Sequence, residues 1–355
     1  MTAYIRGIGN ISPQHSWEAS DYPGEFVLYE GNRLKCIEPG YKEFIKPIHM
    51  RRMSRTLKMG VAAAGKCLAD AGVEVPDAII VGTGLGMMQD TEKFLTSLLD
   101  NEEKFLTPTS FIQSTHNTVG AHIAVMLKCN SYNFTYVNEN LSFEGALLDS
   151  ILRLKEDPEE KILLGGIDEL TDAYFTITNN ASFWKKGIKD NSQMLDDKST
   201  GAIAGEGSGF FVLSGKEHPD NYAQFVGVDT FYQPIDNEET AAFINDFLSS
   251  NGMDVSDIDL LISGVNGDPG SDAVFNEITH NFLNDIPLGF YKHLCGEYYT
   301  STSFASWLAA MALKTQKLPD YVMREGNTVP GSLKNILIYN QSNNTNHALI
   351  LLSAC

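Results

Sequence analysis

Cysteines are few in this sequence, and long apolar runs are missing. Five cysteines occur among 355 residues, and their scattered positions form neither a disulfide framework nor a set of metal ligands. The apolar runs are far shorter than the roughly 20 residues of a membrane-spanning helix. The opening MTAYIRGIGNISP is broken by glycine and lacks the pattern of a secretory signal. We therefore expect a soluble, cytoplasmic protein with reduced thiols and no metal site; its cysteines are Cys36, Cys67, Cys129, Cys295 and Cys355.

Positive charge is scarce as well. The chain has 26 lysine and arginine residues against 45 aspartate and glutamate residues, which gives a net charge of −19. This excess of negative charge argues against a nucleic-acid-binding surface. One local basic cluster, formed by Arg51, Arg52, Arg55 and Lys58, has two interpretations: a patch for an acidic partner or a solvated helix face.

The chain does contain a regular alternation of short β-branched runs with longer helical patterns. The clearest helix is predicted over residues 54–71, where Leu57, Val61 and Leu68 recur at helical spacing and Gly72 stands at the C-cap. Further helices are predicted over residues 116–127, 145–156, 239–250 and 301–313. Strands are predicted over residues 3–8, 78–81, 132–137, 161–164, 222–228, 260–265, 335–340 and 348–352, and after a glycine-rich turn within residues 204–213.

The alternation occurs twice, before and after a polar stretch at residues 214–220. We predict two similar halves, residues 1–214 and 215–355, which share one core because no low-complexity linker separates them. Alternating strands and helices indicate a layered α/β fold with buried, mostly parallel strands.

A glycine-rich segment, GTGLG at residues 82–86, follows one of the predicted strands. Its spacing lacks the third glycine of the dinucleotide-binding fingerprint, and no acidic residue ends a second strand about twenty residues further on. We interpret these glycines as allowing tight turns and close contact between strand and helix. No nucleotide cofactor is expected.

Several segments together carry a family resemblance. They are IRGIGNISP at residues 5–13, RRMSR with the helix after it at 51–72, GTGLG at 82–86, PTSFIQSTHN at 108–117, Gly165-Gly166, GEGSG at 205–209 and, less closely, residues 261–265 and 292–296. These segments resemble the β-ketoacyl synthase family, specifically its elongating members and their chain-length-factor relatives. The resemblance spans nearly the whole chain and is most specific in the first half.

The resemblance implies a thiolase-like fold of five layers, α/β/α/β/α, made of two similar halves with mostly parallel sheets. It also implies a dimer in which the strand near residues 132–137 pairs across the two-fold axis, acyl-carrier-protein substrates and no cofactor. The expected interface or acyl-tunnel positions are Phe111, Gln113, Thr115, His116 and Phe134. Phe143 is expected to plug the pocket beside the catalytic turn.

The catalytic positions depart from the family pattern. In active members, a cysteine at a sharp strand-to-helix turn attacks the acyl thioester. An ungapped count back from Gly165-Gly166 places Asn140 at that turn, and an amide cannot form a thioester. The family's two histidines stabilise an enolate or oxyanion, and Asn266 and Glu297 stand at their positions.

The remaining positions of the family's site are altered too. Lys292 matches the family's lysine, but without its partners it is not a catalyst. The glycine-phenylalanine gate of active members is replaced by NQSNN at residues 340–344. An ionised Glu297 would repel a malonyl carboxylate and an enolate oxygen alike. The resemblance therefore implies a chain without ordinary condensing activity.

Other candidate nucleophiles have simpler structural interpretations. Ser142, the hydroxyl nearest the turn, lacks a base, so we interpret it as a helix N-cap with Glu144 in the first turn. Cys295 and His293 are near each other in sequence, but alternating residues often point apart, and a buried structural thiol is the better interpretation.

Two other groups of titratable residues have the composition of a site. His116 and His122 are six residues apart, so they lie on different helix faces and do not suit a metal ion. Glu139, Glu144 and Glu297 form a possible carboxylate cluster near the turn, for which solvated or capping roles are the commoner interpretation.

The residues and the resemblance lead to three functional hypotheses. The leading one is a chain-length-factor-like subunit that pairs with an active ketosynthase in polyketide, aryl-polyene-like or specialised fatty-acid synthesis. The second keeps catalysis: decarboxylation of malonyl-carrier protein, with Asn140 and Asn266 as amide donors. The third is a non-catalytic homodimer that binds acyl groups or acts as a scaffold.

Overall fold

The computed structural model describes residues 3–18, 22, 24–329 and 331–355. Over these residues ten strands form one continuous sheet in the order β3-β2-β4-β5-β1-β6-β10-β9-β7-β8. The strands are β1 (Ala3–Ile11), β2 (Ala78–Gly82), β3 (Tyr132–Tyr136), β4 (Lys161–Asp168), β5 (Gly207–Ser214), β6 (Gln224–Tyr232), β7 (Leu260–Ser263), β8 (Leu288–Phe290), β9 (Asn335–Ser342) and β10 (Asn346–Ser353).

The strand order repeats between the two halves of the chain. Strands β1 to β5 lie in the order 3-2-4-5-1, and β6 to β10 lie in the corresponding order read from the opposite end of the sheet. The two half-sheets meet where β1 pairs with β6, at Ala3 with Phe225 and at Tyr4 with Gln224. Two similar halves were predicted, and the topology repeats in this way; the exact division at residue 214 stays a prediction.

The expectation of mostly parallel strands was wrong. Five strand pairings are antiparallel and four are parallel. The parallel pairs lie at the outer part of each half-sheet, whereas β5 and β1 in one half, and β10 and β6 in the other, run antiparallel to their neighbours. One of the antiparallel pairs is the hairpin of β9 and β10, which the three residues 343–345 close; Asn343 and Asn344 in this turn have φ angles of 51° and 52°.

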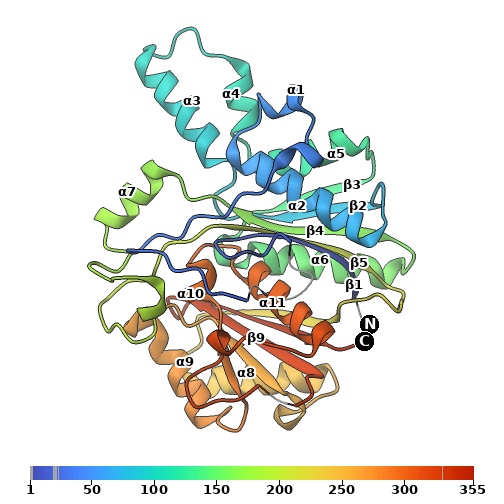
Figure 1. Cartoon of the computed structure of the whole chain (residues 1–355), viewed down its shortest axis with the longest axis vertical. Helices are drawn as coiled ribbons and strands as arrows, with labels where there is room; N and C mark the ends of the chain where they lie inside the picture. The colour runs from blue at the N-terminus through green and yellow to red at the C-terminus, as the bar shows by residue number, and fades with distance from the viewer. Residues whose placement is uncertain (1–2, 19–21, 23, 330) are drawn as a thin grey trace.

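Helices cover both faces of each half-sheet (Figure 1), which gives the predicted five layers. The longer helices are α2 (Arg55–Ala71), α3 (Met88–Asp100), α5 (Thr118–Leu127), α6 (Ser142–Glu156), α7 (Asp172–Asn180), α8 (Asn237–Ser250), α9 (Pro269–Asn281) and α11 (Thr302–Thr315). The short ones are α1 (Pro47–Met50), α4 (Pro108–Gln113) and α10 (Lys292–Cys295), with 3-10 turns at Tyr41–Glu43, Glu139–Leu141, Asn191–Gln193, Val255–Asp257 and Asp320–Val322.

Three hydrophobic clusters hold the layers together. Helices α6 and α11 lie between the two half-sheets and contribute to the central cluster. Helices α2 and α5 cover the outer face of the first half, and α8 and α9 cover the outer face of the second. In β4, Ile162 and Leu164 point to the central cluster and Leu163 points to the outer one, so both faces of this strand are apolar and buried.

Local sequence signals account for the best-predicted elements. Helix α2 ends at Gly72 as expected, because this glycine adopts the left-handed conformation with φ of 66°. Gly9 of β1 brings that strand close to α2, where an added Cβ would lie 2.1 Å from the Ala63 carbonyl oxygen. Helices α1, α3, α4, α7, α9 and α10 and the short strand β8 were not predicted. No helix among the described residues is long and apolar enough to cross a membrane.

The basic cluster at the start of α2 is not simply a solvated helix face. Arg51 and Arg52 are exposed, but the Arg55 guanidinium donates to both carboxylate oxygens of Glu206, at 2.6 and 2.7 Å, and to Glu38 at 2.5 Å. Because the Glu206 side chain is fully buried, this ion pair fixes α2 to the start of β5. The solvated interpretation is therefore wrong for Arg55.

Candidate functional site

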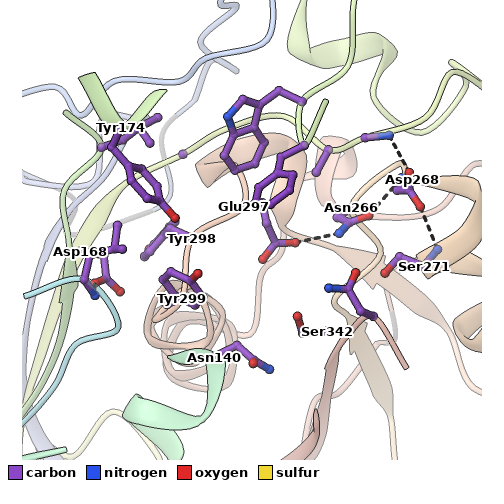
Figure 2. Close-up of a pocket in the computed structure, with 18 of the residues that line it drawn as sticks. Asn140, Asp168, Tyr174, Asn266, Asp268, Ser271, Glu297, Tyr298, Tyr299 and Ser342 are labelled. Carbon is purple, nitrogen blue, oxygen red and sulfur yellow. Dashed lines mark hydrogen bonds between the residues drawn. The ribbon is translucent and has the colours of Figure 1, made fainter. Parts of the chain in front are cut away.

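A cavity of about 330 Å³ lies where strands of both halves end. Asp168 at the end of β4, Asn266 beyond β7 and Ser342 at the end of β9 all line it, together with residues of the loops at 182–205 and 297–299. Figure 2 shows these side chains around one open space. The lining residues are Leu85, Asn140, Asp168, Glu169, Leu170, Tyr174, Ser182, Phe183, Trp184, Gly201, Ala202, Gly205, Asn266, Asp268, Ser271, Glu297, Tyr298, Tyr299, Ser342 and Asn343.

Asn140 lies in the turn that joins β3 to α6. The turn is sharp, since Glu139 has a φ of 46° and α6 begins at Ser142. Gly82 lets this helix start approach the sheet, because an added Cβ would lie 2.4 Å from the Ser142 carbonyl oxygen. Asn140 is 6% exposed and lines the cavity. This is a strand–turn–helix position of the expected kind; that Asn140 replaces a cysteine there stays a prediction.

Of the two polar atoms of the Asn140 amide, one is hydrogen-bonded and the other is not. Its Oδ1 accepts a hydrogen bond of 3.1 Å from Nδ2 of Asn346, at the start of β10. Its Nδ2 is buried and has no hydrogen-bond partner among the described residues. The amide therefore presents a donor that the described part of the chain leaves unpaired.

The N-cap prediction for Ser142 was wrong. Leu141 is the N-cap residue of α6, and Ser142 is the first residue of the helix. The Ser142 hydroxyl donates to the Glu139 carbonyl oxygen at 2.6 Å and accepts from the Asn138 backbone N–H at 2.8 Å. Its role is to close the turn that carries Asn140.

Asn266, Glu297 and Lys292 form one connected group. Nδ2 of Asn266 donates to Oε2 of Glu297 at 2.9 Å, and the same oxygen accepts from the Lys292 ammonium at 2.7 Å. Oδ1 of Asn266 accepts from the Asp268 backbone N–H at 3.0 Å. The structure thus brings Asn140, Asn266 and Glu297 to the same cavity, while Lys292 is 1% exposed and lies behind Glu297.

Close backbone packing positions Glu297. The backbone N–H of Gly205 donates to the Glu297 carbonyl oxygen at 3.0 Å, and the Glu297 N–H donates to the Ile203 carbonyl oxygen at 2.7 Å. An added Cβ on Gly205 would lie 2.0 Å from the Cys295 carbonyl oxygen. The glycine at position 205 is therefore required by the close approach of these two segments rather than by phosphate binding.

Asp168 organises the glycine-rich loop that follows β2. Its Oδ1 accepts hydrogen bonds from the Gly84 and Leu85 backbone N–H groups and the Thr83 hydroxyl, at 2.8–3.0 Å. Its Oδ2 accepts from the backbone N–H and hydroxyl of Thr300, at 3.1 and 2.9 Å. Because this carboxylate occupies the loop's donors, the structural interpretation of the loop is supported over a phosphate-binding one.

Burial raises the pKa of Asp168 to about 6, and the hydrogen bonds from Leu85, Thr300, Thr83 and Gly84 oppose that shift. No motif in the sequence identified this residue. The only signal was its position at the end of the strand that contains Gly165-Gly166, where side chains of parallel strands meet a ligand cavity.

The three glutamates near the turn do not form a cluster. Glu139 is exposed, Glu297 is paired with Lys292, and Glu144 is 1% exposed in the first turn of α6. Neither carboxylate oxygen of Glu144 has a hydrogen-bond partner that satisfies geometric criteria among the described residues. Burial raises the pKa of Glu144 to about 7, while Thr302 and Lys292 act in the opposite direction. The solvated interpretation of Glu144 was therefore wrong.

Cys295 and His293 are not a catalytic pair. The Cys295 thiol is fully buried and donates to the Gly296 carbonyl oxygen at 3.3 Å, and burial raises its pKa. His293 is hydrogen-bonded through Nε2 to the Tyr321 carbonyl oxygen at 2.8 Å, and burial lowers its pKa to about 4. The prediction of a buried structural thiol is confirmed.

The expected interface residues fall into two groups. Phe111 on α4 and Phe134 on β3 are 57% and 47% exposed, Thr115 and His116 are exposed or nearly so, and Gln113 is half-buried. Phe143 is fully buried in the central cluster, where its ring centroid lies 5.9 Å from that of Phe211. It fills the core behind the turn and does not line the cavity.

Comparison with known proteins agrees with the predicted resemblance. Residues 34–186 match the model of the β-ketoacyl synthase N-terminal domain. All of this chain and 99% of the ishigamide ketosynthase/chain length factor superpose with a TM-score of 0.81 at 17% identity. A β-ketoacyl synthase from Burkholderia phymatum STM815 gives 0.81 at 15% identity, with 100% of this chain and 99% of that chain covered.

A third structure has the same fold. It is the ketosynthase (ApeO) in complex with its chain length factor (ApeC) from Xenorhabdus doucetiae, with a TM-score of 0.76 at 14% identity over 100% of this chain and 98% of that chain. At these identities the likeness establishes the fold. The predicted thiolase-like fold is confirmed over the whole chain, and the predicted family resemblance is confirmed through the N-terminal domain.

Proposed function

We propose that this chain, which carries a β-ketoacyl synthase N-terminal domain within a complete ketosynthase fold, is a non-condensing subunit that pairs with an active ketosynthase. Its role is that of a chain length factor: it completes the dimer and limits the partner's acyl tunnel. The pathway is polyketide, aryl-polyene-like or specialised fatty-acid synthesis, and the acyl chains arrive on an acyl carrier protein.

The chemistry of the cavity carries this proposal. Condensation needs a nucleophile that forms a thioester, and Asn140 offers an amide at the turn where one is expected. It also needs donors for an enolate oxygen. The Asn266 amide is already committed to Glu297 and to the Asp268 backbone N–H. The Glu297 carboxylate would repel both a malonyl group and an enolate.

The outer edge of the sheet supports pairing. Strand β3 is hydrogen-bonded to β2 on one side and ends the sheet on the other. Its Tyr132 and Phe134 rings stack on each other with centroids 6.1 Å apart, and both are partly exposed. Leu148 and Leu152 of α6, which packs against this part of the sheet, are 45% and 48% exposed. An unpaired apolar edge of this kind is expected to be covered by a partner.

The similar structures include complexes of the proposed type. One is a ketosynthase in complex with its chain length factor, and another is a type II polyketide synthase acyl-carrier protein in complex with its ketosynthase. We extend this mode of assembly to the present chain as part of the proposal.

The pairing is tested by native mass spectrometry of the chain alone and with the ketosynthase encoded nearest to it. We expect a one-to-one complex, and Phe134→Glu is expected to weaken it at least ~100-fold because a charge then lies in an apolar interface. The matched control is Ile235→Glu, at a side chain that is 89% exposed in the other half. A stable homodimer that does not bind the ketosynthase would overturn the proposal and favour a homodimeric scaffold.

Decarboxylation of malonyl-carrier protein is a second candidate, which one observation favours. The unpaired Nδ2 of Asn140 is a donor of the type that stabilises an enolate oxygen. Glu297 opposes it, because a carboxylate in this cavity repels the malonyl carboxylate and the enolate oxygen alike. Release of carbon dioxide from malonyl-carrier protein by the isolated chain would establish this activity.

A further inference from the structure

The cavity has an unusual balance of charge. Four carboxylate side chains line it, namely Asp168, Glu169, Asp268 and Glu297, and its lining residues include no lysine or arginine. Aromatic side chains line it as well: Tyr174, Phe183, Trp184, Tyr298 and Tyr299. Aromatic faces and carboxylates together are the environment that proteins use to bind organic cations.

Cations stand behind two of these carboxylates. Glu297 is paired with the buried Lys292, and Glu169 lies 3.7 Å from the Arg55 guanidinium. The other two accept hydrogen bonds from uncharged donors, and the Lys185 ammonium is close enough to Asp268 to help stabilise its negative charge. Asp268 accepts from the backbone N–H groups of Gly201, Gly270 and Ser271, and Asp168 accepts from loop N–H groups and hydroxyls. The cavity therefore keeps a negative potential, which opposes an anionic ligand.

A second observation, independent of the carboxylates, points to a ligand. Asn140 is 6% exposed, and its Oδ1 accepts a hydrogen bond from Nδ2 of Asn346. Its Nδ2 is buried without a partner among the described residues, and a buried donor without an acceptor destabilises the folded state. Figure 2 places Asn140 and Glu297 on the same open space, from different elements. A ligand that supplies a carbonyl oxygen would satisfy this donor.

We propose that the cavity binds a small molecule that carries both a carbonyl oxygen and a protonated amine, as an aminoacyl group does. The carbonyl oxygen accepts from Asn140 Nδ2. The ammonium group lies against the carboxylates, with Glu297 contributing Oε1, the oxygen not used by Lys292 and Asn266. The volume of about 330 Å³ is at the small end of the range for ligand pockets, so the bound group is short.

This inference does not depend on the proposed pairing, because binding is measured on the isolated chain. The probes are glycinamide, propionamide and malonamate, which share one carboxamide and carry a positive, no and a negative charge at neutral pH. Ligand-observed NMR titration gives their affinities. We expect glycinamide to bind saturably, propionamide at least tenfold more weakly, and malonamate more weakly still.

Two variants locate the binding. Asn140→Ala removes the amide donor and Glu297→Gln removes one charge, and each is expected to weaken glycinamide binding at least tenfold. The control is Glu325→Gln at an exposed position. Thermal unfolding identifies any variant that fails to fold, and the charge series on the unmodified protein then decides the matter. The proposal is overturned if no probe binds saturably, if malonamate binds as tightly as glycinamide, or if both folded variants bind like the unmodified chain.

Discussion

Replacing Glu297 with methionine is expected to destabilise the protein by about 3–5 kcal/mol, the cost of leaving a buried charge without its partner. Lys292 is 1% exposed, and its ammonium donates to Glu297 at 2.7 Å. Once an apolar side chain takes the place of the carboxylate, the folded state either holds an uncompensated cation or must release its proton. Urea unfolding of the purified chain measures this loss as a lower midpoint.

The reverse substitution gives the matched control. Lys292→Met leaves a carboxylate whose side chain is 26% exposed toward the cavity, where water solvates it. We therefore expect a smaller loss than for Glu297→Met, and a smaller loss again for the double variant, because two apolar side chains leave no unpaired charge. Equal losses for both single variants, or an additive double variant, would contradict the pairing that the geometry indicates.

Replacing Glu144 with glutamine is expected to change how stability depends on pH. Burial raises the folded-state pKa of Glu144 from 4.5 to about 7. Below pH 4.5 both the folded and unfolded states hold the proton, so ionisation contributes nothing. Between pH 4.5 and about 7 the unfolded state loses the proton first, and the natural protein becomes less stable. Above that range the full penalty of about 3 kcal/mol is present.

Glutamine does not ionise, so the Glu144→Gln variant lacks this penalty. The difference in unfolding free energy between variant and natural protein is expected to rise by about 3 kcal/mol between about pH 4.5 and about pH 8. The cost of burying the new amide is the same at every pH and cancels from the trend. Glu74→Gln, at an exposed position, serves as the control and should show no trend. A flat difference for Glu144→Gln would mean that the carboxyl is solvated.

The sequence predicted the elements that carry their own signals. Helix α2 has apolar residues at helical spacing and a glycine C-cap, and both were found where expected. Helix α9 was missed because Pro269-Gly270 resembles a loop, although Asp268 caps it by accepting from two backbone N–H groups. Helix α3 was missed because it is mostly exposed and has one buried residue, Asp90.

The same holds for the site: residues that the family resemblance marks were predicted, and a residue whose role depends on tertiary contacts was not. The family resemblance led to Asn140, Asn266 and Glu297, which lie up to 157 positions apart (297 − 140) and line one cavity. Asp168 was not found, since its role depends on contacts with Thr83 and Thr300, and no local pattern records such contacts. The segment at residues 340–344 was interpreted only as a lost gate. In the structure its Asn343-Asn344 pair lies in the turn of the hairpin between β9 and β10, which was not predicted.

Whether this chain performs condensing chemistry is decided by elongation assays on the reconstituted complex. The complex of this chain with its ketosynthase is assayed for acyl-chain elongation with Asn140→Ala in this chain, and separately with the ketosynthase's own catalytic cysteine replaced by alanine. We predict that Asn140→Ala leaves the elongation rate within about twofold, while the ketosynthase variant abolishes it. Elongation that is lost with Asn140→Ala in an intact complex, or that persists without the ketosynthase's cysteine, would contradict the assignment of a non-condensing subunit.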